Sequence, residues 1–291
     1  RHCKVLAAMG CHVAVVSRRT VSWKPCYSSV SEALQNEQPD YVVVASLTSE
    51  HEQDLNALAA CGFSGKVLVE KPLFPNLKDV PANSFRRLGI GYDMRFLPVM
   101  NRLKELLEQE TAVFTVQAYV GQYLPDWRSN QDYRNSYSAS KSKGGGVLRD
   151  LSHELDYLNW LFGGWEAVTA AGGRVSDLEI DSDDAWSIML RMKKCSLVSL
   201  QINYLDRVPR RFLLVNLPNK TIYVDLITGQ LEINEKVEHW PISGDEAYKR
   251  EHMAMLSPVQ TENVVCGLPE ALEVLETIAA IENSAATMSC I

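Results

Sequence analysis

The sequence lacks the features that would direct the chain to a membrane or to nucleic acid. No stretch reaches the roughly 18 consecutive apolar residues that a membrane-spanning helix needs. There is no run of Lys and Arg, and 36 acidic residues outnumber 29 basic ones, which gives a net charge of −7. Since nucleic acids and anionic lipid surfaces bind basic patches, we expect neither as a partner. No secretory signal is seen at the start, so we expect a cytoplasmic protein.

Metal, disulfide and serine-hydrolase sites also lack their signatures. The seven cysteines are scattered, odd in number and never form C-x-x-C, so neither a disulfide framework nor a zinc knuckle is predicted. No H-x-x-x-H pair indicates a metal, and no G-x-S-x-G marks a nucleophilic serine. The dinucleotide fingerprint G-x-G-x-x-G does not occur between a buried strand and a helix either.

The first third of the chain alternates continuously apolar runs with helical patterns. With 291 residues, 46% hydrophobic and 22% charged, the chain has the composition of one large or two ordinary globular domains. Apolar runs separated by helices are typical of parallel strands that are buried on both faces of a doubly wound sheet. The runs cover residues 12–16, 41–45, 66–70 and 88–92, and the helices cover 28–37 and 49–61.

The pattern changes near residue 93. Residues 121–143 form a long, polar, aromatic-rich loop, and loops of this length are usually functional. The run Gly144-Gly145-Gly146 after it is interpreted as a flexible turn before a helix. Consecutive strand-like runs with short turns then predict a mostly antiparallel sheet. The expected strands cover 112–120, 184–192, 195–204, 211–217, 220–225 and 230–234, and the expected helices cover 96–108, 147–162, 246–256 and 267–286.

Lys71 is the first candidate for a functional residue. It lies in Glu70-Lys71-Pro72, directly after a predicted parallel strand, and ligands of open α/β sheets bind beyond the carboxyl ends of the strands. Pro72 leaves the preceding peptide bond open to the cis geometry. The alternative is a turn that carries a solvated charge pair.

Asp150, His153 and Asp156 form the second candidate group. Their spacing of three places them on one face of a helix. A His flanked by carboxylates can shuttle a proton, because its pKa lies near neutrality and a carboxylate can orient the ring. The alternative is a helix N-terminus that Asp150 caps, with His153 on the surface.

The residues after the first apolar run bear on the choice of cofactor. NAD-specific dinucleotide folds usually place an acid there, whereas an Arg accommodates the 2′-phosphate of NADP. Here the residues are Ser17, Arg18 and Arg19, which slightly favours NADP over NAD. Two Arg residues on an ordinary surface turn are the alternative.

Taken together, these motifs resemble those of the Gfo/Idh/MocA family, named after glucose-fructose oxidoreductase and inositol dehydrogenase. The resemblance covers essentially the whole chain. The motifs match those of the family, and so do their order and their spacing along the chain. They are residues 40–46 followed by His51, the E-K-P signature at 70–72, the strand end at 91–96, the glycine run with Asp150, His153 and Asp156, and the closing helix at 271–281.

The resemblance implies an NAD(P)-dependent dehydrogenase that transfers a hydride to or from a carbinol carbon of a sugar, sugar nucleotide or polyol. It implies that Lys71 and His153 lie at the reacting hydroxyl, with His153 as general acid/base and Asp150 as a catalytic residue beside it. The implied cofactor residues are Ser17, Arg18, Arg19, Ser46, Leu47, Thr48, His51, Glu70, Lys71 and Arg95. The implied substrate residues are Lys71, Tyr123, Trp127, Tyr133, Arg134, His153 and Asp156. A homo-oligomer, dimer or tetramer, is implied as well.

Two departures from the family pattern shape the expected fold. Many members have three residues between the acid and the His, whereas Asp150 and His153 have two, so Asp150 is either a catalytic residue or a helix cap. The glycine loop of the family normally ends just before an Arg-His pair, and this chain begins with Arg1-His2. We therefore expect the first strand and the loop to lie upstream, roughly 10–15 residues away by strand-plus-loop length.

The expected fold class is α/β. Residues 1–92 are predicted to form a Rossmann-type parallel sheet whose first strand and glycine loop are missing. Residues 93–291 are predicted to form an α+β domain with an open, mostly antiparallel sheet, for substrate binding and oligomerisation.

Two other functions stay open at this point. A chain without a glycine loop is compatible with a cofactor-poor binding or regulatory protein that has a degraded nucleotide site. Some relatives use NAD only transiently, so an NAD-dependent glycosidase or epimerase is the other alternative.

Overall fold

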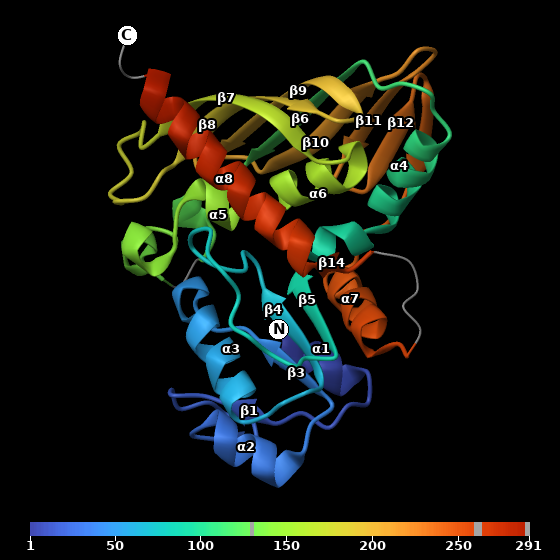
Figure 1. Ribbon diagram of the computed structural model, residues 1–291. Helices are drawn as coiled ribbons and strands as arrows, with labels where there is room; N and C mark the ends of the chain where they lie inside the picture. The colour runs from blue at the N-terminus through green and yellow to red at the C-terminus, as the bar shows by residue number, and fades with distance from the viewer. Residues whose placement is uncertain (129–130, 259–263, 289–291) are drawn as a thin grey trace.

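Two β-sheets stand one above the other in the computed structural model, which describes residues 1–128, 131–258 and 264–288 (Figure 1). Within these residues the smaller sheet has four strands in the order β14-β5-β4-β3. Strands β3, β4 and β5 run parallel, and β14 pairs antiparallel with β5. Their bounds are Tyr41–Val44, Lys66–Glu70 and Arg87–Gly91 for β3 to β5, and Cys266–Gly267 for β14.

Helices cover both faces of this small sheet, as the apolar runs predict. Val67, Leu68 and Val69 in the central strand β4 are 0% exposed. In Figure 1, α3 lies on one side of the sheet, and α1 and α7 lie on the other. Ser29 caps α2, because its hydroxyl accepts the backbone N–H of Glu32 at 3.2 Å. The helix bounds are His2–Ala8 for α1, Val30–Glu37 for α2, His51–Ala60 for α3 and Glu246–Leu256 for α7.

The first predicted strand is shorter than expected. Only Val15–Val16 (β1) of the run at 12–16 is paired, and its partner is Cys26–Tyr27 (β2), which the sequence did not predict. These two strands are parallel and form a separate sheet among the described residues. The helical and strand predictions for 28–37, 41–45, 49–61, 66–70 and 88–92 are confirmed to within about three residues at each end.

The larger sheet is mostly antiparallel, as predicted. Among the described residues its strands follow the order β13-β12-β11-β10-β6-β9-β8-β7, and only the β6–β9 pair is parallel. The sequence missed β7 and β13. The strand bounds are Thr115–Gly121 (β6), Trp165–Gly173 (β7), Ala185–Met192 (β8), Cys195–Asn203 (β9), Arg210–Asn216 (β10), Thr221–Asp225 (β11), Gln230–Ile233 (β12) and Lys236–His239 (β13).

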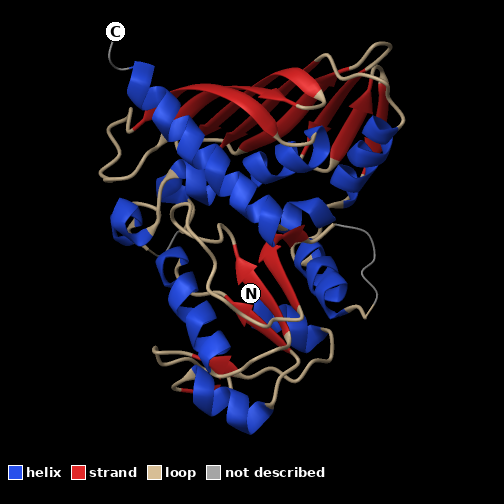
Figure 2. Ribbon diagram, in the orientation of Figure 1, coloured by secondary structure: helices blue, strands red, loops and turns tan. Residues whose placement is uncertain are grey.

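Helices pack against one face of the larger sheet only (Figure 2). Burial therefore alternates along its strands, so that every second residue of β8 is buried. These helices are Pro98–Glu108 (α4), Val147–Asp150 (α5), His153–Phe162 (α6) and Leu268–Met288 (α8). In the described part of the chain, no helix is both long and apolar enough to cross a bilayer.

The prediction of a single helix over 147–162 is wrong in one respect, because the structure has two helices there. The chain leaves the helical conformation at Leu151, where φ is −103° and ψ is 31°, and a new helix begins at His153. His153 is therefore the first residue of α6, and Asp150 is the last residue of α5.

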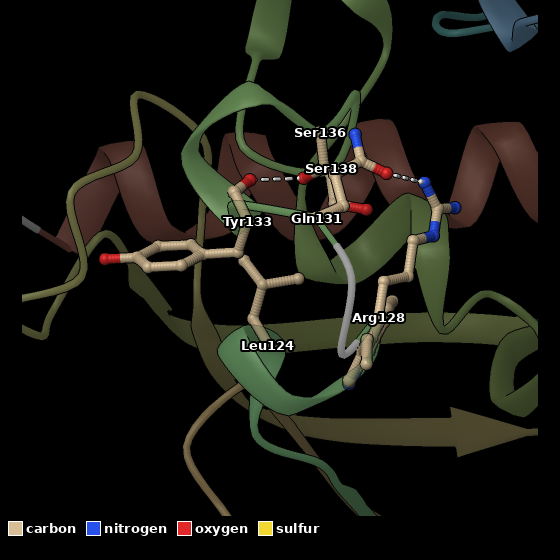
Figure 3. Close-up of a pocket in the computed structure, with 7 residues that line it drawn as sticks. Leu124, Arg128, Gln131, Tyr133, Ser136 and Ser138 are labelled. Atoms are coloured by element: carbon tan, nitrogen blue, oxygen red, sulfur yellow. Dashed lines mark hydrogen bonds between the residues drawn. The ribbon is translucent and has the colours of Figure 1, made fainter.

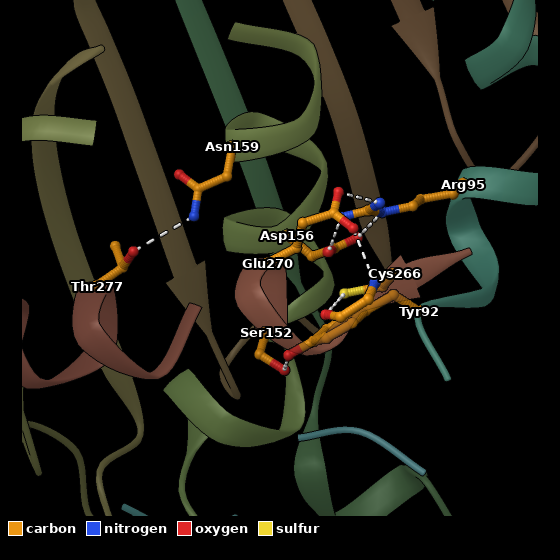
Figure 4. Close-up of polar contacts among 9 residues, drawn as sticks. Tyr92, Arg95, Ser152, Asp156, Asn159, Cys266, Glu270 and Thr277 are labelled. Carbon is orange, nitrogen blue, oxygen red and sulfur yellow. Dashed lines mark hydrogen bonds and ion pairs between the residues drawn. The ribbon is translucent and has the colours of Figure 1, made fainter. Parts of the chain in front are cut away.

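A buried ion pair joins the segment after β5 to two helices that pack under the larger sheet. Arg95, in a 3-10 helix after β5, donates two hydrogen bonds to Asp156 of α6 at 2.6 and 2.9 Å. It also donates to Glu270 of α8 at 2.7 Å (Figure 4). Arg95 and Asp156 are each 1% exposed, so this pair is shielded from solvent and holds three segments in one arrangement.

The Asp156→Asn substitution should destabilise the fold strongly. It leaves the buried guanidinium of Arg95 with less negative charge, and breaking such a pair costs about 3–5 kcal/mol of unfolding free energy. Chemical denaturation measures this cost. The exposed pair of Glu246 and Arg250 supplies the control, because Glu246→Gln should leave the unfolding midpoint unchanged. Equal unfolding midpoints of the two variants would contradict a stabilising role of the Arg95–Asp156 pair.

Candidate active site

Polar residues follow each parallel strand of the small sheet at its carboxyl end. Ser46 lies just beyond β3, Lys71 follows β4, and Asp93 lies two residues beyond β5. The carboxyl ends of parallel strands meet at one edge of the sheet, which is where open α/β sheets bind ligands. The three side chains therefore share one edge.

Lys71 connects this edge to the helices under the larger sheet. Its Nζ donates a hydrogen bond to the backbone carbonyl oxygen of Asp150, the last residue of α5. Its backbone N–H donates to the carboxylate of Glu70 at 3.1 Å, and the Lys71-Pro72 peptide bond is cis. Lys71 is therefore not the solvated turn residue of the alternative interpretation.

His153 begins α6, three residues after the Asp150 carbonyl group that Lys71 binds. Its Nε2 is 3.7 Å from Oδ1 of Asp93, and its ring meets Tyr92 edge-on at 5.6 Å. Among the described residues, Nδ1 of His153 is buried without a hydrogen-bond partner. Burial, together with repulsion from Lys71 and Arg211, lowers the pKa of His153 well below its usual value. The imidazole is therefore neutral, which is the form that can accept a proton.

Asp93 is the carboxylate nearest to His153, and the sequence interpretation missed it. Burial raises the pKa of Asp93 to about 6, and repulsion from Glu70 adds to this rise. The positive charges of Lys71 and Arg211 oppose it. A carboxyl that titrates near neutrality beside a histidine can exchange a proton with it.

Asp150 neither caps a helix nor bonds to His153. Its carboxylate accepts the hydroxyl of Tyr204 at 2.5 Å, and the hydroxyl of Tyr137 also bonds to it. Burial raises the pKa of Tyr204 well above its usual value, so the phenol stays protonated and donates. The cap interpretation of Asp150 is thus wrong, and the structure makes Asp150 the link between Lys71 and the two tyrosines.

The glycine run before α5 packs closely against neighbouring residues, so it is more than a flexible turn. A Cβ added to Gly145 would lie 2.1 Å from the carbonyl oxygen of Tyr137, and one on Gly146 would lie 2.1 Å from Oδ1 of Asp183. Gly146 also has φ of +121°, in the region that favours glycine. The run lets α5 begin tightly against its neighbours, which fixes the helices that carry Asp150 and His153.

Arg149 fastens the same helix to the loop after Lys71. Its Nε donates to the carbonyl oxygen of Pro75 at 2.6 Å, and its Nη1 donates to Glu282 of α8 at 2.7 Å. The residue is 4% exposed. The Arg149 contacts therefore hold α5 against α8 and against the loop that follows Lys71.

The residues predicted for the cofactor after β3 differ in their exposure to solvent. Ser46 and Leu47 are partly exposed beside the exposed Ala45, and the Ser46 hydroxyl is buried without a partner among the described residues. Thr48 and His51 are buried, and Nδ1 of His51 donates to the carbonyl oxygen of Leu73 at 3.0 Å. His51 therefore anchors the loop that follows Lys71.

Glu70 and the residues after β1 complete the predicted cofactor group. Oε1 of Glu70 lies 2.8 Å from Nε2 of His2. Burial would raise the pKa of Glu70, but His2 and Lys71 outweigh it and lower the pKa. Arg18 pairs with Glu50 at 3.3 Å, whereas the Ser17 hydroxyl bonds to the backbone of Arg19.

The loop residues predicted for the substrate line or adjoin a small pocket (Figure 3). Trp127 and Tyr133 line it, and Trp127 meets Tyr204 edge-on at 5.1 Å, which places the pocket beside the Asp150 link. Tyr123 stacks under Arg207 at 3.5 Å. The other lining residues are Leu124, Arg128, Gln131, Ser136 and Ser138.

Three predicted residues are committed to structural ion pairs. Arg134 is exposed and binds Asp132 at 2.8 Å and Glu179 at 2.9 Å. Arg95, expected at the cofactor, and Asp156, expected at the substrate, are paired with each other in the interior. Arg95 and Asp156 are each 1% exposed, so both side chains are directed to the interior in this structure.

The sequence interpretation missed three residues that surround the site. They are Asp93, Tyr204 and Arg211, and the last binds the buried Glu154 at 2.8 Å. Asp93 had a usable signal, because it follows a predicted parallel strand as Lys71 does. Tyr204 and Arg211 lie near the ends of antiparallel strands, and nothing in their local sequence distinguishes them. In the described chain, no cluster of His, Cys, Asp and Glu could hold a metal ion.

Comparison with protein families gives two matches that together cover most of the chain. Residues 8–83 match the oxidoreductase family with an NAD-binding Rossmann fold. Residues 100–220 match the GFO/IDH/MocA C-terminal domain.

Curated relatives match over part of their length. An uncharacterized oxidoreductase of Synechocystis sp. is 31% identical over 157 residues, which is 50% of this chain and 40% of the relative. Levoglucosan dehydrogenase of Pseudarthrobacter phenanthrenivorans is 27% identical over 177 residues, 57% of this chain and 44% of the relative. The matches thus span less than half the length of these relatives.

Solved structures match over nearly the whole chain. Levoglucosan dehydrogenase in complex with NADH and L-sorbose superposes with a TM-score of 0.82 at 16% identity, covering 98% of this chain and 93% of that one. GenD2 from gentamicin A biosynthesis, in complex with NAD, gives a TM-score of 0.77 at 22% identity over 98% and 90% of the two chains. At these identities the likeness shows the fold alone.

Two substitutions should move the pKa of Asp93 in opposite directions. Lys71→Met removes a positive charge that lowers it, so the pKa should rise above about 6. Glu70→Gln removes a negative charge that raises it, so the pKa should fall below about 6. Carboxyl ¹³C NMR titration measures both, and shifts of the same sign would refute the arrangement.

Proposed function

The chain belongs to the Gfo/Idh/MocA family of oxidoreductases, and from this premise we propose that it is an NAD(P)-dependent dehydrogenase acting on CH–OH groups. In this proposal a hydride moves to or from a carbinol carbon of a sugar, sugar nucleotide or polyol. A dehydrogenation of this kind needs an aligned substrate and one group that moves the hydroxyl proton.

The hydrogen bond from Lys71 to the backbone of Asp150, three residues before His153, carries the proposal. Lys71 directly follows β4 and His153 begins α6, and the Lys71 charge acts on the His153 ring. We assign to Lys71 the binding of the substrate hydroxyl, because an ammonium group stabilises negative charge on the oxygen. His153 accepts or returns the hydroxyl proton, and Asp93 and Asp150 position the two groups.

The residues at the sheet edge fit a nicotinamide cofactor. The unpartnered Ser46 hydroxyl is buried at the end of β3, next to the exposed Ala45, where the fold class binds dinucleotides. Ser46, Leu47 and Glu70 would hold the part of the cofactor nearest to the reaction. When bound, the cofactor supplies the hydride chemistry.

The pocket beside the Asp150 link supports a sugar-like substrate. Trp127 and Tyr133 offer aromatic faces that suit the apolar faces of sugar rings. Among the proteins with this fold are levoglucosan dehydrogenase, solved with NADH and levoglucosan, and a dehydrogenase solved with NADH and UDP-GlcNAcA. Tyr123 and Arg134 would border the far end of the substrate in this proposal.

The domain division and the assembly belong to the same proposal. We assign residues 1–92 to cofactor binding and 93–291 to substrate binding and oligomerisation. The face of the large sheet that the helices leave uncovered is the surface we expect between copies of a dimer or tetramer (Figure 2).

Replacement of either proposed active-site residue should abolish turnover. Lys71→Ala and His153→Ala should each lower kcat/KM at least about 100-fold, because loss of proton transfer or of charge stabilisation removes this much. Circular dichroism should show the fold unchanged. Lys236→Ala and His239→Ala on the edge strand β13 are matched controls with full activity. Near-normal activity of both site variants would overturn the proposal.

Cofactor titration should favour NADPH over NADH. Arg18 is engaged by Glu50, so we expect Arg19 to bind the 2′-phosphate, and Arg19→Ala should weaken NADPH binding by about 10-fold or more. NADH binding should not change, and Arg18→Ala is the matched comparison. Tighter NADH binding would reverse the preference, and binding of neither would support the cofactor-poor alternative. Reduced cofactor accumulating in solution would count against a glycosidase or epimerase.

A further inference from the structure

Two exposed arginines at the pocket of Figure 3 have no acidic partner among the described residues. Arg128 lines the pocket, where its Nη1 donates to Gln131 at 3.4 Å and its Cζ lies 5.7 Å from the centroid of the Tyr137 ring. The Cζ of Arg207 lies 3.5 Å from the centroid of the Tyr123 ring. We call Arg128 and Arg207 the pocket arginines.

The pocket arginines come from two segments that lie side by side. Strands β6 and β9 run parallel and end in register. Beyond them, the backbone N–H of Leu124 donates to the carbonyl oxygen of Tyr204 at 3.0 Å, so the two segments stay together. Arg128 follows on the first segment and Arg207 on the second. The contact of Arg207 with Tyr123, the residue before Leu124, therefore places both arginines at one end of the larger sheet.

The carboxylates nearest in sequence do not neutralise the pocket arginines. Asp206 precedes Arg207, but it accepts hydrogen bonds from Tyr119 at 2.9 Å and from Arg210 at 3.0 Å. Asp126 is exposed and forms no ion pair within the described chain. The described residues that line the pocket include no Asp or Glu. Positive charge is therefore left uncompensated at this end of the sheet.

Other arginines near this end of the sheet do have acidic partners. With 36 acidic residues against 29 basic ones, the chain has carboxylates to spare. Each of these neighbouring arginines lies within ion-pair distance of a carboxylate: Arg134 pairs with Asp132 and Glu179, Arg210 with Asp206, and Arg211 with Glu154. The uncompensated charge is thus a local property of the pocket.

A guanidinium over a tyrosine ring is well placed to bind an anion. The ring of Tyr123 contacts the flat face of the Arg207 group, which leaves the N–H donors at its edge for another partner. Those donors match the oxygens of a phosphoryl group or a carboxylate two at a time. Gln131 accepts from Arg128 and keeps its own amide N–H donors. The pocket thus offers positive charge together with hydrogen-bond donors, which is the chemistry of an anion site.

A series of contacts joins the pocket to the proposed active site. Trp127, which also lines the pocket, meets the Tyr204 ring edge-on at 5.1 Å. The Tyr204 hydroxyl donates to the carboxylate of Asp150 at 2.5 Å, and the backbone carbonyl oxygen of Asp150 accepts from Lys71. Two residues thus separate the pocket wall from Lys71, so a group bound in the pocket belongs to a part of the substrate remote from the reacting carbon.

We propose that the substrate carries an anionic group, phosphoryl or carboxylate, and that Arg128 and Arg207 bind it. The carbinol carbon then reacts at Lys71 and His153 while the anionic group holds the other end of the sugar in the pocket. Binding at both ends aligns the carbinol carbon with the cofactor. This inference rests on the proposed function, and it narrows the substrate from sugars and polyols in general to charged ones.

A purely structural role is the competing explanation, since each pocket arginine also packs on a tyrosine ring. The two roles differ in what removal of the charge changes. Loss of a packing contact lowers the unfolding temperature and acts on neutral and anionic ligands alike. Loss of an anion contact lowers the affinity for anionic ligands and leaves the affinity for neutral ones unchanged.

Calorimetric titration of the whole chain, with and without NADPH, tests the proposal. The probes are glucose, glucuronate, glucose 6-phosphate and UDP-glucose, which share a sugar ring and differ in charge. At least one anionic probe should bind about 10-fold more tightly than glucose, because a charge-assisted contact contributes this much. Arg128→Gln and Arg207→Gln should each weaken its binding about 10-fold and leave glucose binding unchanged. Arg191→Gln is the matched control, since Arg191 is exposed near the other end of the sheet and pairs with Glu166.

Failure of all three anionic probes to bind more tightly than glucose would overturn the proposal, and so would tight binding that neither arginine substitution weakens. The tightest probe identifies the charged group: glucuronate indicates a carboxylate, and the other two indicate a phosphoryl group. Added salt should weaken the binding of that probe, since both arginines are exposed. Arginine-dependent binding without reduction of NAD(P)⁺ by any probe would instead count against the proposed function.

Discussion

The hydrogen bond from the Lys71 ammonium to the carbonyl oxygen of Asp150 is the contact on which the site depends. It joins the carboxyl edge of the parallel sheet to the helix pair under the larger sheet. The surrounding structure holds this contact in place: glycines bring α5 close to its neighbours, and Arg149 fastens α5 to the loop after Lys71. The proposed chemistry therefore requires both sheets at once.

Most of the fold could be predicted from the sequence because its strands carry strong periodic patterns. The runs around Val42 and Val67 are continuously apolar, as parallel strands buried on both faces must be. The missed strands have no such pattern. β13 is a charged edge strand, β7 is rich in Ala and Gly, and β2 pairs over two residues only. The break at Leu151 was not predicted because no Gly or Pro marks it, and Leu148, Arg149, Leu151 and Glu154 are good helix formers.

The candidate site was predictable where its residues follow a motif and hidden where tertiary structure assembles it. Lys71 and His153 were named from their places after a strand and on a helix. Asp93 reaches His153 only because the end of β5 meets the start of α6. The ion pair of Arg95 with Asp156 was hidden for a related reason, since the spacing of the two residues is the same whether they bind a ligand or each other. Only the 1% exposure of both separates the two cases.

The two-residue strand β14 has a consequence for the order in which the protein can fold. It closes one edge of the small sheet, yet it lies 175 residues after its partner β5, counted from Gly91 to Cys266. His2 likewise finds His252 only near the end of the chain. At the usual rate of synthesis, the amino-terminal sheet waits roughly 9–35 s on the ribosome with this edge open. The small sheet is thus among the last parts of the fold to be finished, and a chaperone that shields open strand edges would have its main task in that interval.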